Sequence, residues 1–130
     1  MKEVYDFLKK CETYYLATTE EDQPRVRPFG TVNIFEEKLY IQTGRVKDVY
    51  LQIVTNPKVE ISGMVGNDWI RVSGTLVIDD RIEAKQSMLD NYPSLQKMYS
   101  ADDGNTQVLY FKDAIATIYS FEQEPKVIKF

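Results

Sequence analysis

The chain has 130 residues, 43% of them hydrophobic and 28% charged, with a formal net charge of −4. This length predicts a single domain that can fold around an apolar core without metals or disulfides. The acidic balance argues against a general nucleic-acid surface, which needs a basic stripe. With one cysteine and no histidine, the chain cannot build an internal disulfide, a Cys-x-x-Cys site, a Ser-His-Asp or Cys-His catalytic centre, or a histidine-ligated zinc or haem site. If the protein catalyses a reaction, we expect a bound cofactor to carry the chemistry.

The chain is predicted to begin with a helix and a hairpin. Apolar side chains at helical spacing predict a helix over residues 3–11, on whose buried stripe Cys11 is a small apolar member. Residues 13–19 are rich in β-formers and end in the polar turn 20–24. The next strand is expected to run from Arg25 to about Phe35. Its Pro28 lacks a backbone donor and therefore marks an edge or a bulge.

The middle of the chain continues this alternation. A tight turn at 36–38 leads to a strand over 39–43, and a short helix over 47–55 is stopped by Asn56-Pro57. A strand over 58–65 then turns at 66–68 into a strand over 69–78. The clean alternation of that last strand favours an antiparallel sheet with one buried face.

The last part of the chain contains a helical region, a loop and two strands. Residues 81–99 are predicted to be helical, in two pieces broken at Pro93. The loop 100–106 contains aspartates but lacks the ligand spacing and final glutamate of a calcium loop, so no metal is expected. Strands are predicted over 107–111 and 115–121, followed by a tail over 125–130. Together these elements predict one mainly β domain over 1–130, a small barrel of six or seven antiparallel strands with flanking helices.

Three cations and a predicted helix start lie close together in this order of elements. Arg25 and Arg27 share one strand face, and Lys47 stands where a helix follows Gly44. A helix N-terminus with nearby cations is a natural seat for a phosphate group, so we predict a phosphate-bearing cofactor there. The alternative is a solvated strand face, with the arginines paired to Glu20, Glu21 or Glu37 and Lys47 an ordinary surface lysine.

Several motifs occur in an order that resembles a known family. They are Arg25-Val26-Arg27-Pro28-Phe29-Gly30, Leu39-Tyr40-Ile41-Gln42-Thr43-Gly44, a lysine, Asn56-Pro57-Lys58-Val59 and Trp69-Ile70-Arg71-Val72-Ser73-Gly74. In this order they resemble the pyridoxamine 5′-phosphate oxidase-like family, and the short chain is most similar to its nitroimidazole-reductase-like branch. The pyridoxamine oxidases proper carry a C-terminal arginine and histidine. This chain has no histidine, so it is not expected to make pyridoxal phosphate.

The resemblance implies a split β-barrel homodimer with FMN at the subunit interface. By position, Arg27 and Lys47 would meet the phosphate, with Arg25 or Arg45 assisting. The residues implied along the flavin ring and ribityl chain are Pro28, Phe29 and Gly30 through their backbone, Gln42 and Thr43 through hydrogen bonds, and Gly44 through close approach. Trp69 and Arg71 are candidates for reaching the partner's site, although Trp69 also suits a core or a dimer interface.

Three functional hypotheses follow from these residues. The first is an FMN-dependent oxidoreductase that takes electrons from NAD(P)H and gives them to a small nitro or quinone-like acceptor. The second is a flavin-binding carrier or sensor without turnover, which would use the same pocket residues. The third, an oligonucleotide-binding barrel, is disfavoured by the acidic balance. The charged start of the sequence and the lack of a long apolar run lead us to expect a cytoplasmic protein with no membrane or nucleic-acid partner.

Overall fold

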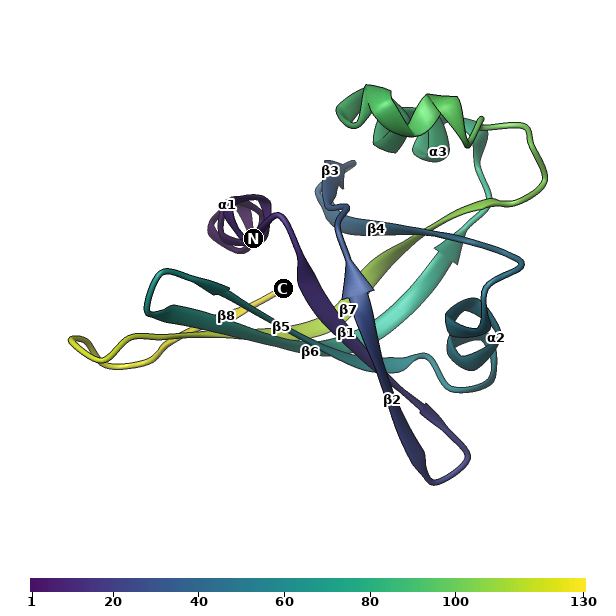
Figure 1. The fold of residues 1–130 in the computed structure, drawn as a ribbon. Helices are drawn as coiled ribbons and strands as arrows, with labels where there is room; N and C mark the ends of the chain where they lie inside the picture. Colours follow the sequence, from purple (N-terminus) through teal and green to yellow (C-terminus); the bar gives the residue numbers. More distant parts are fainter.

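The computed structural model describes residues 1–130 as one antiparallel sheet of eight strands with three α-helices and a short 3-10 helix (Figure 1). None of the helices has the length and apolar character needed to cross a membrane. In chain order the elements are α1 (Lys2–Cys11), β1 (Tyr14–Glu20), β2 (Gln23–Phe29), β3 (Asn33–Phe35), β4 (Lys38–Gly44), α2 (Asp48–Thr55), β5 (Lys58–Val65), β6 (Asp68–Asp79), α3 (Ile82–Asn91), η1 (Pro93–Lys97), β7 (Thr106–Tyr119) and β8 (Lys126–Lys129).

The order of the strands requires the sheet to curl. The hydrogen-bonded path runs β2-β1-β5-β6-β7-β4-β3, with β8 added beside β7. If this seven-strand path were flat, its two ends would lie roughly 29 Å apart, six spacings of about 4.8 Å. Yet β2 and β3, which form those ends, are joined only by residues 30–32, a connection that spans at most about 14 Å from Phe29 to Asn33. The sheet therefore closes on itself as a barrel that is open along one seam, where β2 and β3 diverge without pairing.

The interior of the barrel is a single apolar cluster. Its members include the inward residues of β6, Ile70 and Val72, which are fully buried. The helix α1 adds Val4 and Leu8 to the same cluster, and α2 adds Val49 and Ile53. Because both helices bury apolar side chains in this core, the position of α2 beside the end of β4 is fixed by packing (Figure 1). The helix α3 packs on β3, β4 and β7.

The predicted strand from Arg25 to Phe35 is two strands. The chain leaves β1 after Phe29 and joins β4 only from Asn33 onward. Between them, side chains replace the ladder as hydrogen-bond partners: the Tyr14 hydroxyl donates to the Thr31 carbonyl at 2.6 Å, and the Val32 N–H donates to the Tyr92 hydroxyl at 3.0 Å. These side chains satisfy a buried backbone that pairs with neither edge, so the prediction of one continuous strand was wrong.

The C-terminal strands also differ from the sequence-based prediction. The expected strands 107–111 and 115–121 form one strand, β7, that changes register against β6 between Ser73 and Thr75. Gly74 lies at this irregularity because a Cβ there would come within 3.1 Å of Phe111 and 3.3 Å of Ala114. The expected tail is partly a strand, β8. The predicted break of the helical region at Pro93 is confirmed, and so is the mainly β antiparallel barrel, with eight strands in place of six or seven.

Candidate functional site

Two neighbouring hollows lie at one end of the molecule, where the seam meets the start of α2. We call the larger one, of about 510 Å³, the cationic hollow; it is lined by Glu20, Arg25, Val26, Arg27, Lys47, Asp48, Val49 and Gln52. The smaller one, of about 180 Å³, is the seam hollow; it is lined by Pro28, Phe29, Gly30, Thr31, Gln42, Thr43, Lys47, Leu95, Met98 and Tyr99. Lys47 lines both, so the two hollows meet at this residue.

Arg27 is held in the cationic hollow by neutral partners. Its guanidinium donates to the Leu16 carbonyl at 3.2 Å, to the Thr18 hydroxyl at 2.7 Å and to the Gln52 side-chain oxygen. No carboxylate forms a salt bridge with it, and two of its five N–H donors have no protein partner. Burial and the nearby charge of Arg25 lower the pKa of Arg27, and Asp48 acts in the opposite direction. The arrangement orients a guanidinium and leaves its charge available to an external anion.

Lys47 is positioned by a tightly bound turn. The Arg45 N–H donates to the Asn105 carbonyl at 2.7 Å, the Val46 N–H donates to the Asn105 side chain at 3.2 Å, and the Lys47 N–H donates to the Gly44 carbonyl at 3.1 Å. The next residue, Asp48, begins α2, which has no side-chain cap. The first N–H groups of this helix are therefore free to bind an anion. Lys47 lines the hollow together with the first residues of the helix and forms no salt bridge.

Asp103 holds the loop that supports this turn. Its carboxylate accepts from the Asn105 N–H at 2.8 Å and from the Thr106 N–H and hydroxyl at 2.7 and 2.9 Å. Burial opposes its charged form, yet these hydrogen bonds, together with one from the Ser100 N–H, lower the pKa of Asp103 well below its usual range. Asp103 therefore fixes Asn105, and Asn105 fixes the turn before Lys47.

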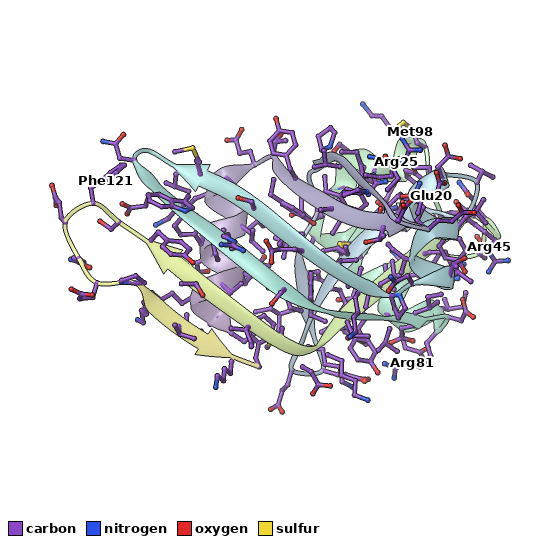
Figure 2. The ribbon with its side chains drawn as sticks, turned by 90° about the horizontal axis from the view of Figure 1, so that it is seen from below. Glu20, Arg25, Arg45, Arg81, Met98 and Phe121 are labelled. Carbon is purple, nitrogen blue, oxygen red and sulfur yellow. The ribbon has the colours of Figure 1, made fainter.

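Arg25 differs from the other two cations because it has a carboxylate partner. Its guanidinium donates to Glu20 at 3.0 Å across the β1–β2 hairpin. Figure 2 shows Glu20 and Arg25 together at the end of the molecule that also carries Met98 and Arg45. The pairing of Arg25 with Glu20, one of the alternatives considered from sequence, is thus present, whereas Arg27 and Lys47 have no such partner.

Two residues that line the seam hollow, Gln42 and Thr43, carry buried polar atoms without partners. Gln42 is 7% exposed and Thr43 is 2% exposed. The Nε2 of Gln42 and the hydroxyl of Thr43 find no hydrogen-bond partner in the protein. A buried, unsatisfied polar group costs about 1–3 kcal/mol. Because the two residues are consecutive on β4, their side chains point to opposite faces of the sheet, and at most one of them points into the hollow.

The remaining wall of the seam hollow is largely apolar. Pro28, Phe29 and Gly30 contribute the end of β2, and the Phe29 ring packs 6.1 Å from that of Tyr14. Leu95 of η1 and the following Met98 and Tyr99 complete this part of the lining. The hollow therefore offers a ligand apolar contacts from these residues beside the polar residues of β4.

Four of the sequence-predicted residues lie outside both hollows. Gly44 packs against the Asn105 side chain, which would lie 3.2 Å from an added Cβ. Arg45 faces Asp80 at 3.9 Å, and Arg71 pairs with Glu60 at 3.1 Å. Trp69 stacks on Tyr119 with ring centroids 5.1 Å apart and lies 5.5 Å from the Phe121 ring. Phe121 is at the end of the molecule opposite Arg25 (Figure 2).

The structure also reveals residues that the sequence analysis missed. Thr18 and Gln52 orient Arg27, and Leu95, Met98 and Tyr99 complete the seam hollow. The signal for Gln52 was a polar residue on the buried face of a helix that otherwise buries Val49 and Ile53. The residues after Pro93 offered no such signal, because nothing in η1 is buried.

The chain matches proteins of known family and fold. The family described as Pyridoxamine 5′-phosphate oxidase matches residues 1–120. A NimC/NimA family protein from Clostridium acetobutylicum is 50% identical with a TM-score of 0.97, over 100% of this chain and 92% of that chain. No curated protein matches the chain. The family resemblance predicted from the sequence, including its branch, is therefore confirmed.

Two more distant structures support the fold. General Stress Protein 26 from Bacillus anthracis is 22% identical with a TM-score of 0.76, over 99% of this chain and 97% of that chain. An FMN binding protein related to pyridoxamine 5′-phosphate oxidase, from Nostoc punctiforme, is 17% identical with a TM-score of 0.65, over 92% and 87%. Both share the split-barrel architecture at low identity.

The buried, unpartnered hydroxyl of Thr43 predicts an unusual mutational result. Thr43→Val removes a buried group that has no partner, so we expect the free energy of unfolding of the ligand-free protein to stay unchanged or to rise by up to about 1 kcal/mol. Thr106→Val is the matched control on the neighbouring strand, because its equally buried hydroxyl donates to Asp103. We expect it to lower stability by about 1–3 kcal/mol. Urea unfolding followed by circular dichroism measures both; an equal loss for the two variants would contradict the assignment.

Proposed function

The chain belongs to the pyridoxamine 5′-phosphate oxidase family, and we propose that it binds FMN with the phosphate in the cationic hollow and the ring in the seam hollow. The observation that carries the proposal is the cationic hollow, where Arg27 is oriented by neutral partners and stands beside Arg25 and Lys47. The two hollows meet at Lys47, as a ligand with a charged tail and a flat head requires. The FMN binding protein from Nostoc punctiforme shares this fold.

The cationic hollow fits a phosphate group in charge and in donors. In the proposed complex, the two free N–H groups of Arg27, the Lys47 ammonium and the first N–H groups of α2 hold the phosphate oxygens. Each charge-assisted hydrogen bond contributes about 1.5–3 kcal/mol. Because Arg27 is already oriented by Leu16, Thr18 and Gln52, little conformational entropy is lost when the phosphate binds.

The seam hollow is lined by Gln42 and Thr43 of β4. We propose that these residues hydrogen-bond polar atoms of the flavin ring or the ribityl chain, one through its side chain and the other through its backbone, since their side chains point to opposite faces of the strand. The backbone of Pro28, Phe29 and Gly30 lies along the ring. Leu95, Met98 and Tyr99 shield it from water, which leaves the apolar face in contact with apolar side chains.

The activity we propose is electron transfer from NAD(P)H to a small nitro or quinone-like acceptor. FMN, when bound, supplies the hydride and electron-transfer chemistry, and the chain supplies binding, orientation and hydrogen bonds. The lining of the seam hollow supports this division of work, since it contains no carboxylate and no histidine. The titratable side chains in this lining are Lys47, which we assign to the phosphate, and Tyr99.

We also propose a homodimer in which Trp69 and Arg71 of one copy complete the flavin site of the partner. Both side chains lie on the outer face of β6, where Arg71 is exposed and Trp69 is partly exposed. Phe121, which contacts Trp69, is 82% exposed, and the neighbouring Met64 is 61% exposed. An aromatic surface of this kind, at the end of the molecule opposite its own hollows, suits contact with a second copy.

FMN binding is tested by titrating the purified protein with FMN and following flavin fluorescence and the absorption spectrum. We expect saturable binding, and we expect Lys47→Ala to weaken it by one to two decades because one charge-assisted contact is lost, about 1.5–3 kcal/mol. Lys112→Ala, which removes an exposed lysine on β7, is the matched control and should bind like wild type. Failure of the wild type to bind FMN would refute the proposal; full affinity in Lys47→Ala would refute the phosphate position.

Turnover is tested with the FMN-loaded protein. We expect NADH or NADPH to bleach the flavin absorption band, and we expect a nitroaromatic or quinone acceptor to restore it with steady consumption of the nicotinamide. A flavin that neither reductant bleaches would indicate the carrier or sensor alternative.

The shared site predicts complementation between two damaged chains. We expect a mass of about 30 kDa by light scattering, twice the 15.1 kDa chain, and weaker FMN binding in Trp69→Ala. If Trp69 serves the partner, a mixed dimer of Lys47→Ala and Trp69→Ala chains contains one intact site. Co-refolding the two variants should then restore tight FMN binding at about a quarter of all sites. No restoration, with mixed dimers present, would place Trp69 in its own subunit's site or in neither.

A further inference from the structure

We propose that Glu20 is the internal counterion of the cationic hollow and that a bound phosphate group displaces its carboxylate. The inference rests on the proposed FMN binding and adds a residue that sets the affinity of that site. Glu20 thereby acts against phosphate binding, although it lies among the cations that favour it.

The carboxylate of Glu20 occupies donors that face the hollow. Its Oε1 accepts from Arg25 at 3.0 Å, and its Oε2 accepts from the Gln52 side-chain amide at 3.4 Å. Gln52 is the same residue whose oxygen accepts from Arg27. Glu20 is thus connected to both arginines of the hollow, directly to one and through Gln52 to the other.

The balance of charge around the hollow makes Glu20 a competitor. Its lining contains the cations Arg25, Arg27 and Lys47 and the anions Glu20 and Asp48, a formal surplus of one positive charge. A phosphate monoester carries a charge of about −1.5 to −2 near pH 7. With Glu20 in place the phosphate would exceed the available positive charge, and two anionic groups would face each other across Arg25.

The Glu20 side chain can rotate out of the cationic hollow, whereas Asp48 is held at the start of α2. It is the last residue of β1, at the edge of the hairpin turn, and its side chain is 51% exposed. It also lines an adjoining hollow of about 420 Å³ between the hairpin and α2, whose lining does not include Arg25 or Arg27. Asp48 lies in the first turn of α2, where the helix dipole stabilises its charge. A rotation of Glu20 into the adjoining hollow would release the Arg25 guanidinium to the phosphate.

This arrangement has a consequence for the ligand that the site retains. Only a group with a strong negative charge of its own replaces the Glu20 carboxylate. The site therefore binds phosphorylated flavin more tightly than uncharged riboflavin, but the difference in affinity is smaller than it would be if all three cations were unpaired. Glu20 therefore keeps FMN exchangeable while holding Arg25 in position when the site is unliganded.

The inference is tested by measuring FMN and riboflavin affinities of wild type and Glu20→Gln by fluorescence titration. The variant keeps the side-chain length and an oxygen that accepts from Arg25, and it removes the charge. We expect FMN to bind about three- to tenfold more tightly, the range for a partly screened like-charge interaction, with riboflavin affinity unchanged. Glu21→Gln removes an equal charge from the adjacent turn residue, which has no hydrogen bond to Arg25 or Gln52, and should change FMN affinity less than twofold.

The outcomes separate this inference from the function on which it rests. Absence of FMN binding by wild type would overturn both. Binding by wild type with equal or weaker binding by Glu20→Gln would overturn the inference alone, and would mean that Glu20 positions Arg25 for the phosphate. An equal gain in Glu20→Gln and Glu21→Gln would overturn it as well, since it would reflect overall charge. Unchanged thermal unfolding of the ligand-free variants confirms that the comparison is between folded proteins.

Discussion

The connection of residues 30–32 is the constraint on which the rest of the structure depends. Because it joins the two ends of the strand path, the sheet has to close, and its closure brings the end of β2 beside the end of β4. The Thr31 hydroxyl accepts from the Gln42 N–H at 3.0 Å, directly across the seam. Residues separated in the sequence by a full hairpin thereby become neighbours around one hollow. The candidate site is a consequence of barrel closure, since neither edge alone could form it.

Hydrogen-bond partners distinguish Arg27 in the cationic hollow from the structural cations elsewhere. Arg81 donates to the carboxylates of Asp79 and Glu36, and these bonds raise its pKa. The same interactions, with a hydrogen bond from Tyr40, lower the pKa of Asp79 to about 2. Arg27 is held only by neutral oxygens. A cation fixed by neutral partners keeps its charge for a ligand, whereas one fixed by carboxylates has already used it.

Local pattern predicted most of the elements and the correct family, and it failed where tertiary contacts replace local ones. Period-two alternation from Arg25 to Phe35 could not reveal that Tyr14 and Tyr92 would satisfy the backbone of residues 31–32. Gln42 and Thr43 were identified as candidate site residues from the family resemblance alone. Their lack of hydrogen-bond partners became visible only in the structure. Leu95, Met98 and Tyr99 could not be identified, because their role depends only on where α3 and η1 pack. Glu20 was considered only as an ordinary partner of Arg25.

The buried polar atoms of Gln42 and Thr43 require the closed barrel to be stable. These two unsatisfied polar groups together cost the ligand-free protein roughly 2–6 kcal/mol, a large share of the 5–15 kcal/mol by which domains are usually stable. An open sheet would relieve that cost by letting water reach Gln42 and Thr43. The closed barrel prevents this, because separating the seam would break the hydrogen bonds of Tyr14, Thr31 and Tyr92 and expose the apolar cluster behind them. The stability of the closed barrel thus outweighs the cost of leaving the polar atoms of Gln42 and Thr43 buried without partners.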